Sequence, residues 1–382
     1  MGVYTEYLDK NLKFEDLTAE RKKQLKRMSV LRKRDLLVYA ADLNKGKAPT
    51  SINYSDLLPV NDQLNNLSGT ALDLILESPG GYGEVAEDIV KLLRGKYNDI
   101  TVIIPGYAKS AATIMAMAAD DIMMGPASAL GPIDAQLSWQ GKNFSADALL
   151  EGMEKIKAET SSTGVLNKAY IPILQGISPG ELQSAENAQN FSKTLVTEWL
   201  AQYKFKNWTE HKSTGVRVTN DDKRERAKEI AGVLCDHRKW LTHGRSIKIA
   251  DLEGMKLRIT DYSADHNLAD AITRYYTLLQ ITFATNIYKV FETTESQIYR
   301  ALAPLVPPPQ QQIGNTATIS VQCSKCAKES KIQANFDKEF PLQEGCQPFP
   351  KNNLFNCPYC GTQIDLSDAK RQLEMQTKKN VL

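Results

Sequence analysis

Residues 101–113 read TVIIPGYAKSAAT, and this stretch decides how the surrounding chain is built. Its first four residues have the apolar, β-branched pattern of a buried strand, a Pro-Gly pair ends the strand, and a run of small residues begins a helix. One serine, Ser110, stands where the strand turns into the helix. Two interpretations follow: Ser110 only caps the helix, or the turn exposes its hydroxyl for chemistry.

The preceding segment, LDLILESPGGYGEVAEDIVKLL, reads as a strand, a turn at Gly80 and Gly81, and an amphipathic helix. Parallel strands present the turns that follow them at the same edge of a sheet, so we expect the Gly-Gly turn beside Ser110. Glycines let backbone N–H groups approach a carbonyl oxygen, and the N–H of Ala111 lies at a helix N-terminus. The pattern therefore predicts an oxyanion site formed by Gly80, Gly81 and Ala111.

Composition narrows the class of protein. The chain has 382 residues, 42% hydrophobic and 24% charged, and a net charge of +2. These values are typical of a soluble globular protein of two or three domains and do not favour nucleic acid as a partner. No apolar run approaches the roughly 20 residues of a membrane helix, and the N-terminal residues are too charged for a signal peptide. We therefore expect no transmembrane segment and a cytoplasmic protein.

The chain divides by composition into four parts. They are a charged helical segment (1–35), an α/β domain with helical additions (36–300), a Pro- and Gln-rich linker (301–317), and a zinc ribbon with a polar tail (318–382). Within the second part, LADAITRYYTLLQITFATNIYKVFETTESQIYRAL reads as one long helix with more apolar surface than a single stripe. Either this helix is wedged under the α/β layer, or its apolar face joins copies of the chain in a homo-oligomer.

Five of the six cysteines lie after residue 320. Cys323 and Cys326 form one CxxC pair, and Cys357 and Cys360 form a second pair, thirty residues further on. Each CxxC turn directs two thiolates at one centre, so the two pairs together predict a tetrahedral Cys₄ site for a structural Zn²⁺ ion. Redox disulfides are the alternative, and a cytosolic chain disfavours them.

Three segments together resemble the serine dehydrogenase proteinase family, a Clp-related set within the Clp-protease and signal-peptide-peptidase group of the crotonase fold. The segments are ESPGG, AKSAATIMAMAADDIMMGPASALGPIDAQ and KWLTHGRSIKIADLEGMKL. The likeness is densest over residues 72–138 and covers much of 36–270. It implies a Clp/crotonase-like core of repeated ββα units, a serine peptidase that acts on proteins or peptides, and an oligomer that encloses its sites.

Carried over residue by residue, the resemblance implies a triad in the chain order Ser, Asp, His. Ser110 is then the nucleophile, Asp134 of LGPIDAQ the orienting acid and His243 of LTHGR the base. The oxyanion N–H groups come from Gly81 and Ala111. Chemistry agrees with the choice of a histidine, because a serine hydroxyl needs a base that works near neutral pH.

Alternatives to this base remain open in the sequence. The chain has only four histidines, and His237 is the second candidate. A Ser-Lys dyad, as in the signal-peptide peptidases, would use Lys155, Lys157 or Lys168, because Lys109 adjoins the serine and is expected to point elsewhere. A lysine base needs burial to lower its pKa.

Two other functions also remain open. A crotonase-like acyl-CoA enzyme would share the fold and the oxyanion turn and would place carboxylates nearby, for which Glu77 and Glu84 are candidates. A catalytically silent scaffold would use the zinc ribbon to bind a protein partner.

Overall fold

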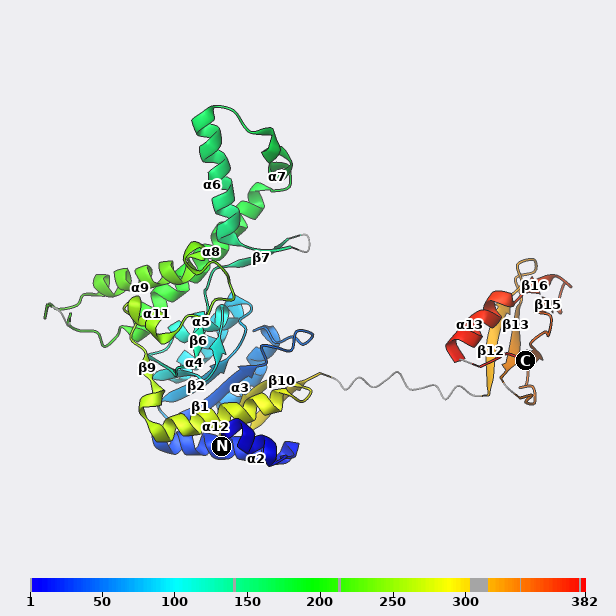
Figure 1. The fold of residues 1–382 in the computed structure, drawn as a ribbon, viewed down its shortest axis with the longest axis horizontal. Coiled ribbons are helices and arrows are strands. Elements are labelled where there is room, and N and C mark those ends of the chain that lie inside the picture. Colours follow the sequence, from blue (N-terminus) through cyan, green and yellow to red (C-terminus); the bar gives the residue numbers. More distant parts are fainter. Residues whose placement is uncertain (1, 140–141, 212–213, 303–314, 337, 378) are drawn as a thin grey trace. The chain divides into compact units, whose positions relative to one another are not determined.

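The computed structural model describes residues 2–139, 142–211, 214–302, 315–336, 338–377 and 379–382. The chain forms two compact units, residues 1–302 and residues 303–382. The first is a mixed α/β unit, as the sequence predicted, and the second is a small β-rich unit with one described helix (Figure 1). Within the described residues, no helix combines the length and the apolar character needed to cross a membrane.

A seven-stranded sheet in the order β11-β10-β1-β2-β3-β5-β9 is the centre of the first unit. Strands β1, β2, β3, β5 and β9 run parallel, and β10 and β11 are added antiparallel beside β1. The bounds are β1 Asp35–Ala41, β2 Leu72–Glu77, β3 Ile100–Ile104, β5 Asp121–Met124, β9 Thr260–Asp261, β10 Ile287–Glu292 and β11 Gln297–Ala301.

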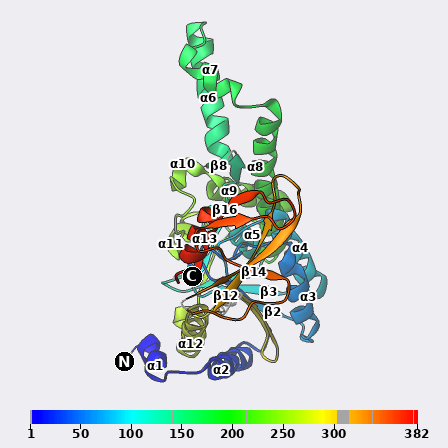
Figure 2. The ribbon, with the colours of Figure 1, turned by 90° about the vertical axis from the view of Figure 1, so that its right-hand side faces the viewer.

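Both faces of this sheet are covered, which explains why its strands read as continuous apolar runs. In β1, Leu37 and Tyr39 pack into the cluster on one face, while Leu36, Val38 and Ala40 pack into the cluster on the other. Helices α2 and α12 lie side by side under the second face (Figures 1 and 2).

The helices of the first unit are the following: α1 Val3–Asp9, α2 Phe14–Arg32, α3 Leu57–Asn65, α4 Gly83–Lys96, α5 Ala111–Met117, α6 Ala146–Thr163, α7 Ile171–Gln175, α8 Pro179–Trp199, α9 Asn220–Cys235, α10 His237–Trp240, α11 Ile249–Gly254 and α12 His266–Phe283. Short 3₁₀ turns cover Tyr54–Asp56, Lys168–Tyr170 and Tyr262–Ala264, and a π turn covers Leu200–Lys204. Figures 1 and 2 show α6 and α7 projecting away from the sheet.

A second, smaller layer stands beyond the carboxyl ends of the main strands. Its strands β4 (Tyr107–Ala108) and β6 (Ala129–Leu130) pair in parallel, and isolated bridges extend them from Ser78 to Ala108 and from Leu130 to Ile247. Main strand β2 is therefore followed by Ser78 and α4, and β3 is followed by β4 and α5. This is the repeated ββα arrangement. A hairpin of β7 (Gln136–Trp139) and β8 (Lys142–Ser145) follows the small layer.

The single long helix predicted over residues 268–302 is wrong beyond Phe283. There α12 ends, and the chain returns as strands β10 and β11 of the main sheet. A residue far away in the sequence contacts this end of the helix: the Lys45 amine donates to the carbonyl oxygens of Phe283, Thr285 and Ile287 at 2.6, 2.8 and 2.6 Å. Most of the apolar residues behind the oligomer argument are buried inside their own unit: Ile272, Tyr275, Leu278, Leu279, Phe283, Ile287, Val290 and Phe291. The remaining one, Ile281, is half-buried and packs against the cluster of Tyr7, Leu17 and Leu278. This segment therefore gives no support to an oligomer.

The second unit combines a three-stranded sheet, a two-stranded hairpin and a helix. Its elements are β12 Thr316–Gln322, β13 Glu329–Asn335, β14 Cys346–Pro348, β15 Leu354–Asn356, β16 Gln363–Asp365 and α13 Ser367–Thr377. Its apolar core is small, with Ile332, Ala334, Phe336, Phe349, Phe355, Leu366 and Val381 buried in one cluster. A core of this size favours an additional source of stability, such as a metal.

Candidate active site

Ser110 occupies a strained backbone position between β4 and α5. Its φ is +52° and its ψ is −120°, a conformation that a side chain bearing a Cβ adopts rarely. Such a residue costs on the order of 1–3 kcal/mol and persists only where the surrounding structure imposes it. The half-buried Ser110 side chain makes no capping hydrogen bond to α5, so the helix-cap interpretation finds no support. The same arrangement, a strained serine between a strand and a helix, occurs at the nucleophile elbow of α/β-hydrolases.

The Gly-Gly turn packs directly against Ser110, as neighbouring parallel strands require. Ser78 ties the two turns together, because its N–H donates to Tyr107 O and its carbonyl oxygen accepts from Lys109 N–H, both at 2.9 Å. Gly80 has a φ of +95°, and a Cβ there would lie 2.6 Å from Lys109 O and 2.7 Å from the Cβ of Ser110. Only glycine fits so close to the serine.

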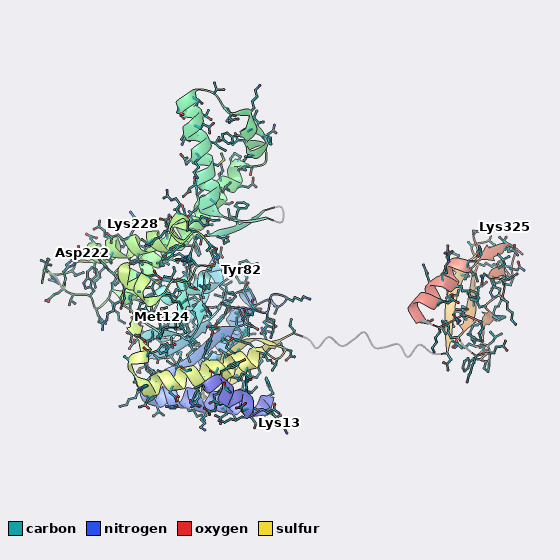
Figure 3. The ribbon with its side chains drawn as sticks, in the orientation of Figure 1. Lys13, Tyr82, Met124, Asp222, Lys228 and Lys325 are labelled. Carbon is teal, nitrogen blue, oxygen red and sulfur yellow. The ribbon has the colours of Figure 1, made fainter. Side chains whose placement is uncertain are left out.

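The backbone around Gly81 is arranged to leave two donors free. Ile52 N–H donates to Gly80 O at 2.7 Å, and Tyr82 N–H donates to Ile52 O at 3.0 Å, so the loop before α3 supports the turn on its outer side. Tyr82 itself is 59% exposed at the surface (Figure 3). Across the described residues, the N–H groups of Gly81 and Ala111 donate to no protein acceptor. Both remain available for a ligand oxygen.

Asp134 and His243 form a close pair in the loops beside this turn. The Nδ1 atom of His243 lies 2.7 Å from Asp134 Oδ1. The Asp134 side chain is 1% exposed, whereas that of His243 is 33% exposed. Because a carboxylate only accepts hydrogen bonds, this contact places a proton on Nδ1, and in the neutral imidazole Nε2 is then the basic nitrogen. The arrangement can hold an imidazole in the tautomer of a general base.

Two further groups face the same carboxylate. The Gln136 side-chain amide donates to Asp134 Oδ2 at 2.7 Å, and His237 Nδ1 lies 3.4 Å from that oxygen. Burial raises the pKa of Asp134, but the hydrogen bonds and charges of His243 and His237 outweigh it and hold this pKa below its ordinary value. Asp134 is therefore an anion at neutral pH. The sequence gives no sign that His237 and His243 share one carboxylate. His237 lies near Asp134 because of the positions of α9 and α10 in the folded unit.

The segments that carry Asp134 and His243 both meet the start of α5. Gly131 N–H donates to Thr113 Oγ1 at 3.0 Å, and the Lys109 amine donates to Arg245 O at 2.9 Å. Asp134 follows Gly131 by three residues in the sequence, and His243 precedes Arg245 by two. No hydrogen bond joins Ser110 to His243 in the part of the chain that the structure describes.

The alternative lysine bases do not have the burial that such a role needs. Lys155 and Lys157 on α6 and Lys168 beyond it are exposed. Lys109 is half-buried, but its amine is bonded to Leu130 O, Arg245 O and Ser246 Oγ. The structure thus gives the serine no buried lysine partner among these candidates.

The carboxylates considered for an acyl-CoA enzyme also lie elsewhere. Glu77 is buried, and its oxygens accept from Tyr107 N–H at 2.7 Å and from the Tyr276 hydroxyl at 3.1 Å. Burial raises the pKa of Glu77 to about 8, against the lowering effect of these hydrogen bonds. Glu84 is exposed on α4. The carboxylate of Glu77 is thus bonded to Tyr107 and Tyr276.

The four CxxC cysteines of the second unit come together as predicted. Their sulfur atoms all lie within 4.8 Å of one another and could hold a metal ion. The Sγ atoms of Cys323 and Cys360 are 3.6 Å apart, and those of Cys326 and Cys357 are 3.7 Å apart. A tetrahedral zinc with Zn–S bonds of about 2.3 Å needs sulfur separations of roughly 3.8 Å, whereas a disulfide needs about 2.05 Å. The sulfurs fit a metal and are not disulfide-bonded.

Comparison with known proteins agrees with the geometry of the first unit. Residues 66–221 match the family described as ClpP-like SDH-type serine proteinase. That range contains Ser110 and Asp134 and ends before His243. The uncharacterized protein MJ0137 of Methanocaldococcus jannaschii is 27% identical over 210 residues, which cover 55% of this chain and 58% of the relative. The uncharacterized protein MJ1495 of the same organism is 30% identical over 136 residues, 35% of this chain and 47% of the relative. The chain thus spans about half the length of these curated relatives.

Proposed function

We propose that this chain, a member of the ClpP-like SDH-type serine proteinases through residues 66–221, hydrolyses peptide bonds through an acyl-enzyme formed on Ser110. The observation that carries the proposal is the strained Ser110 turn, packed on Gly80 beside the Asp134–His243 pair, whose carboxylate is buried. A serine that serves only as a helix cap has no need of a positive φ or of a carboxylate–histidine pair nearby.

The proposed reaction uses each of these residues in turn. His243 Nε2 accepts the hydroxyl proton as Ser110 Oγ attacks the peptide carbonyl carbon, and Asp134 holds the imidazole and stabilises its charge. The N–H groups of Gly81 and Ala111 donate to the carbonyl oxygen as negative charge develops on it. His243 then gives its proton to the leaving amine, and water activated in the same way releases the acyl group from Ser110.

We also propose the setting of the reaction. Four cysteine sulfurs close enough to share one metal ion favour a structural Zn²⁺ ion and a reducing, cytosolic compartment. The substrates are proteins or peptides, and the zinc ribbon is a candidate surface for a protein partner. Family resemblance alone supports a homo-oligomer, since Clp-like subunits shield their serine sites from bystander proteins. Light scattering tests this last point: a discrete multiple of the 42.6 kDa chain is expected.

The decisive experiment is labelling with a fluorophosphonate probe, followed by mass spectrometry of the modified peptide. Wild-type protein should carry the adduct on Ser110, and Ser110→Ala should lose labelling and several orders of magnitude of peptide hydrolysis while remaining folded. Ser68→Ala, at an exposed loop serine, is the matched control and should label normally. Absence of any adduct on wild-type Ser110 would favour the silent scaffold, and copurification of coenzyme A would favour the acyl-CoA enzyme.

A further inference from the structure

Lys109, the residue before Ser110, joins the separate parts of the site. Its side-chain amine donates to Arg245 O at 2.9 Å, to Ser246 Oγ at 3.1 Å and to Leu130 O at 3.2 Å. Arg245 lies two residues after His243, and Leu130 lies four residues before Asp134. One side chain thus reaches from the turn of the serine to both of the loops that carry the carboxylate–histidine pair.

The lysine is fixed along its whole length. Its N–H donates to Ser78 O at 2.9 Å, and its carbonyl oxygen accepts from Ala112 N–H at 2.9 Å. Its stem crosses Gly131, where a Cβ would lie 2.7 Å from Lys109 Cδ and 3.2 Å from Lys109 Cα. A displacement of either loop therefore requires the lysine to lose hydrogen bonds rather than to follow the loop.

The strength of this link depends on the proton of the amine. An ammonium group has three N–H donors for the three oxygen atoms that surround it, and its hydrogen bonds are roughly twice as strong as neutral ones. A neutral amine keeps two N–H groups for the two carbonyl oxygens and can accept from Ser246, but it loses the charge that makes the bonds strong. Proton loss should therefore loosen the loops without detaching them.

We propose that Lys109 is a positioning residue for hydrolysis: its ammonium group fastens the loops of Asp134 and His243 to the turn of Ser110, so that loss of its proton slows the reaction. This inference rests on the proposed function. Lys109 does not touch the reacting atoms, and it acts through the loops to which it is bonded.

The groups around the Lys109 amine set the pH at which it loses its proton, and this pH lies in a range where activity can be measured. Burial, and then the positive charge of Lys248, lower the pKa of Lys109 to about 8. The other ionisable groups on the segments packed around it are Tyr107, whose ring centroid is 5.4 Å from the amine, Arg245, and the Asp134–His243 pair. Activity should therefore fall as the pH rises through about 8, because the ammonium form predominates only below that value.

Three variants test the proposal through the pH profile of kcat and KM. Lys109→Met should lower kcat about 100-fold at pH 7, the effect of a displacement of about 1 Å in a catalytic group, and should change KM much less. Lys109→Arg should recover most of the activity and lose the alkaline fall, because a guanidinium group stays charged. Lys248→Gln should keep activity at pH 7 and move the fall to higher pH, since it removes the neighbouring positive charge.

Several outcomes would overturn the inference. An alkaline fall that persists unchanged in Lys109→Arg would belong to another group, such as Glu77. If the pH at which activity falls is the same in Lys248→Gln as in wild type, the fall also belongs to another group. This second test holds even if arginine fits poorly at position 109. Amide hydrogen exchange of residues 130–134 and 243–247, faster in Lys109→Met, supports the link whether or not the protein is active; unchanged exchange refutes it. If wild-type Ser110 fails to react with the probe, the proposed function fails, while the exchange experiment still decides what Lys109 holds.

Discussion

Replacement of Gly80 by alanine tests how closely the oxyanion turn and Ser110 are packed. The positive φ of Gly80 costs an alanine about 1–2 kcal/mol, and the new methyl group would lie 2.6 Å from Lys109 O and 2.7 Å from the Cβ of Ser110. Relief of such an overlap costs typically about 1–3 kcal/mol. Together these effects should lower the free energy of unfolding by about 2–5 kcal/mol.

The rate at which Ser110 reacts should fall in Gly80→Ala by more than the loss of stability alone explains. Lys109 O belongs to the backbone, so it can move away from the methyl group only if the turn that carries Ser110 moves with it. A displacement near 1 Å corresponds to a loss of about 100-fold in rate, which fluorophosphonate labelling of Ser110 would measure at a temperature where the variant is fully folded.

Gly95→Ala is the matched control for this change. Gly95 lies in α4, and a Cβ there would meet no atom within 4 Å, so alanine should leave labelling unchanged and stabilise the helix by up to about 1 kcal/mol. The reasoning is refuted if Gly80→Ala labels within threefold of wild type and unfolds at the same denaturant concentration.

Two further predictions concern Asp134 and the cysteine cluster. Asp134→Asn should lower kcat by about 10³–10⁴-fold, as in hydrolases whose triad loses its carboxylate. Because the folded-state pKa of Asp134 is below its ordinary value, its carboxylate contributes stability that is present above about pH 4 and is lost as the pH falls further; denaturation curves of the asparagine variant should lack this part of the acid sensitivity. Purified protein should contain one zinc ion per chain, and Cys357→Ser should abolish its binding and unfold the second unit while the first stays folded, because structural zinc sites bind with apparent energies of about 10–16 kcal/mol. Cys346→Ser, outside the cluster, should retain the metal, and zinc-free wild-type protein would contradict the assignment.

The local part of the site could be predicted from the sequence. The neighbouring positions of Gly80 and Ser110 follow from two consecutive βα units, because consecutive parallel strands that pair must present their turns together. The two CxxC pairs were predictable for a similar reason, since each pair fixes the geometry of its own thiols. In both cases the information lies within a few residues of the site.

Features that depend on distant parts of the chain could not be predicted in this way. At the end of α12 the Lys45 amine donates to the Phe283 carbonyl oxygen, and no local pattern records that contact. The apolar residues of β10 also occur at spacings that suit a helix, and only their pairing with β1 makes them a strand. The approach of His237 to Asp134 and the reach of Lys109 to Arg245 likewise depend on tertiary structure.

The strongest argument for function is that several unfavourable features occur at one place. Ser110 has a positive φ, Gly80 and Gly81 sit against other backbone segments, and the buried anion Asp134 faces two histidines. The half-buried amine of Lys109 lies beside them, and burial together with the positive charge of Lys248 lowers its pKa to about 8. The positive φ of Ser110 and the burial of the Lys109 amine are unfavourable to the fold. A structure that served only to fold would have no reason to gather these features around one serine, whereas the proposed peptidase site would use each of them.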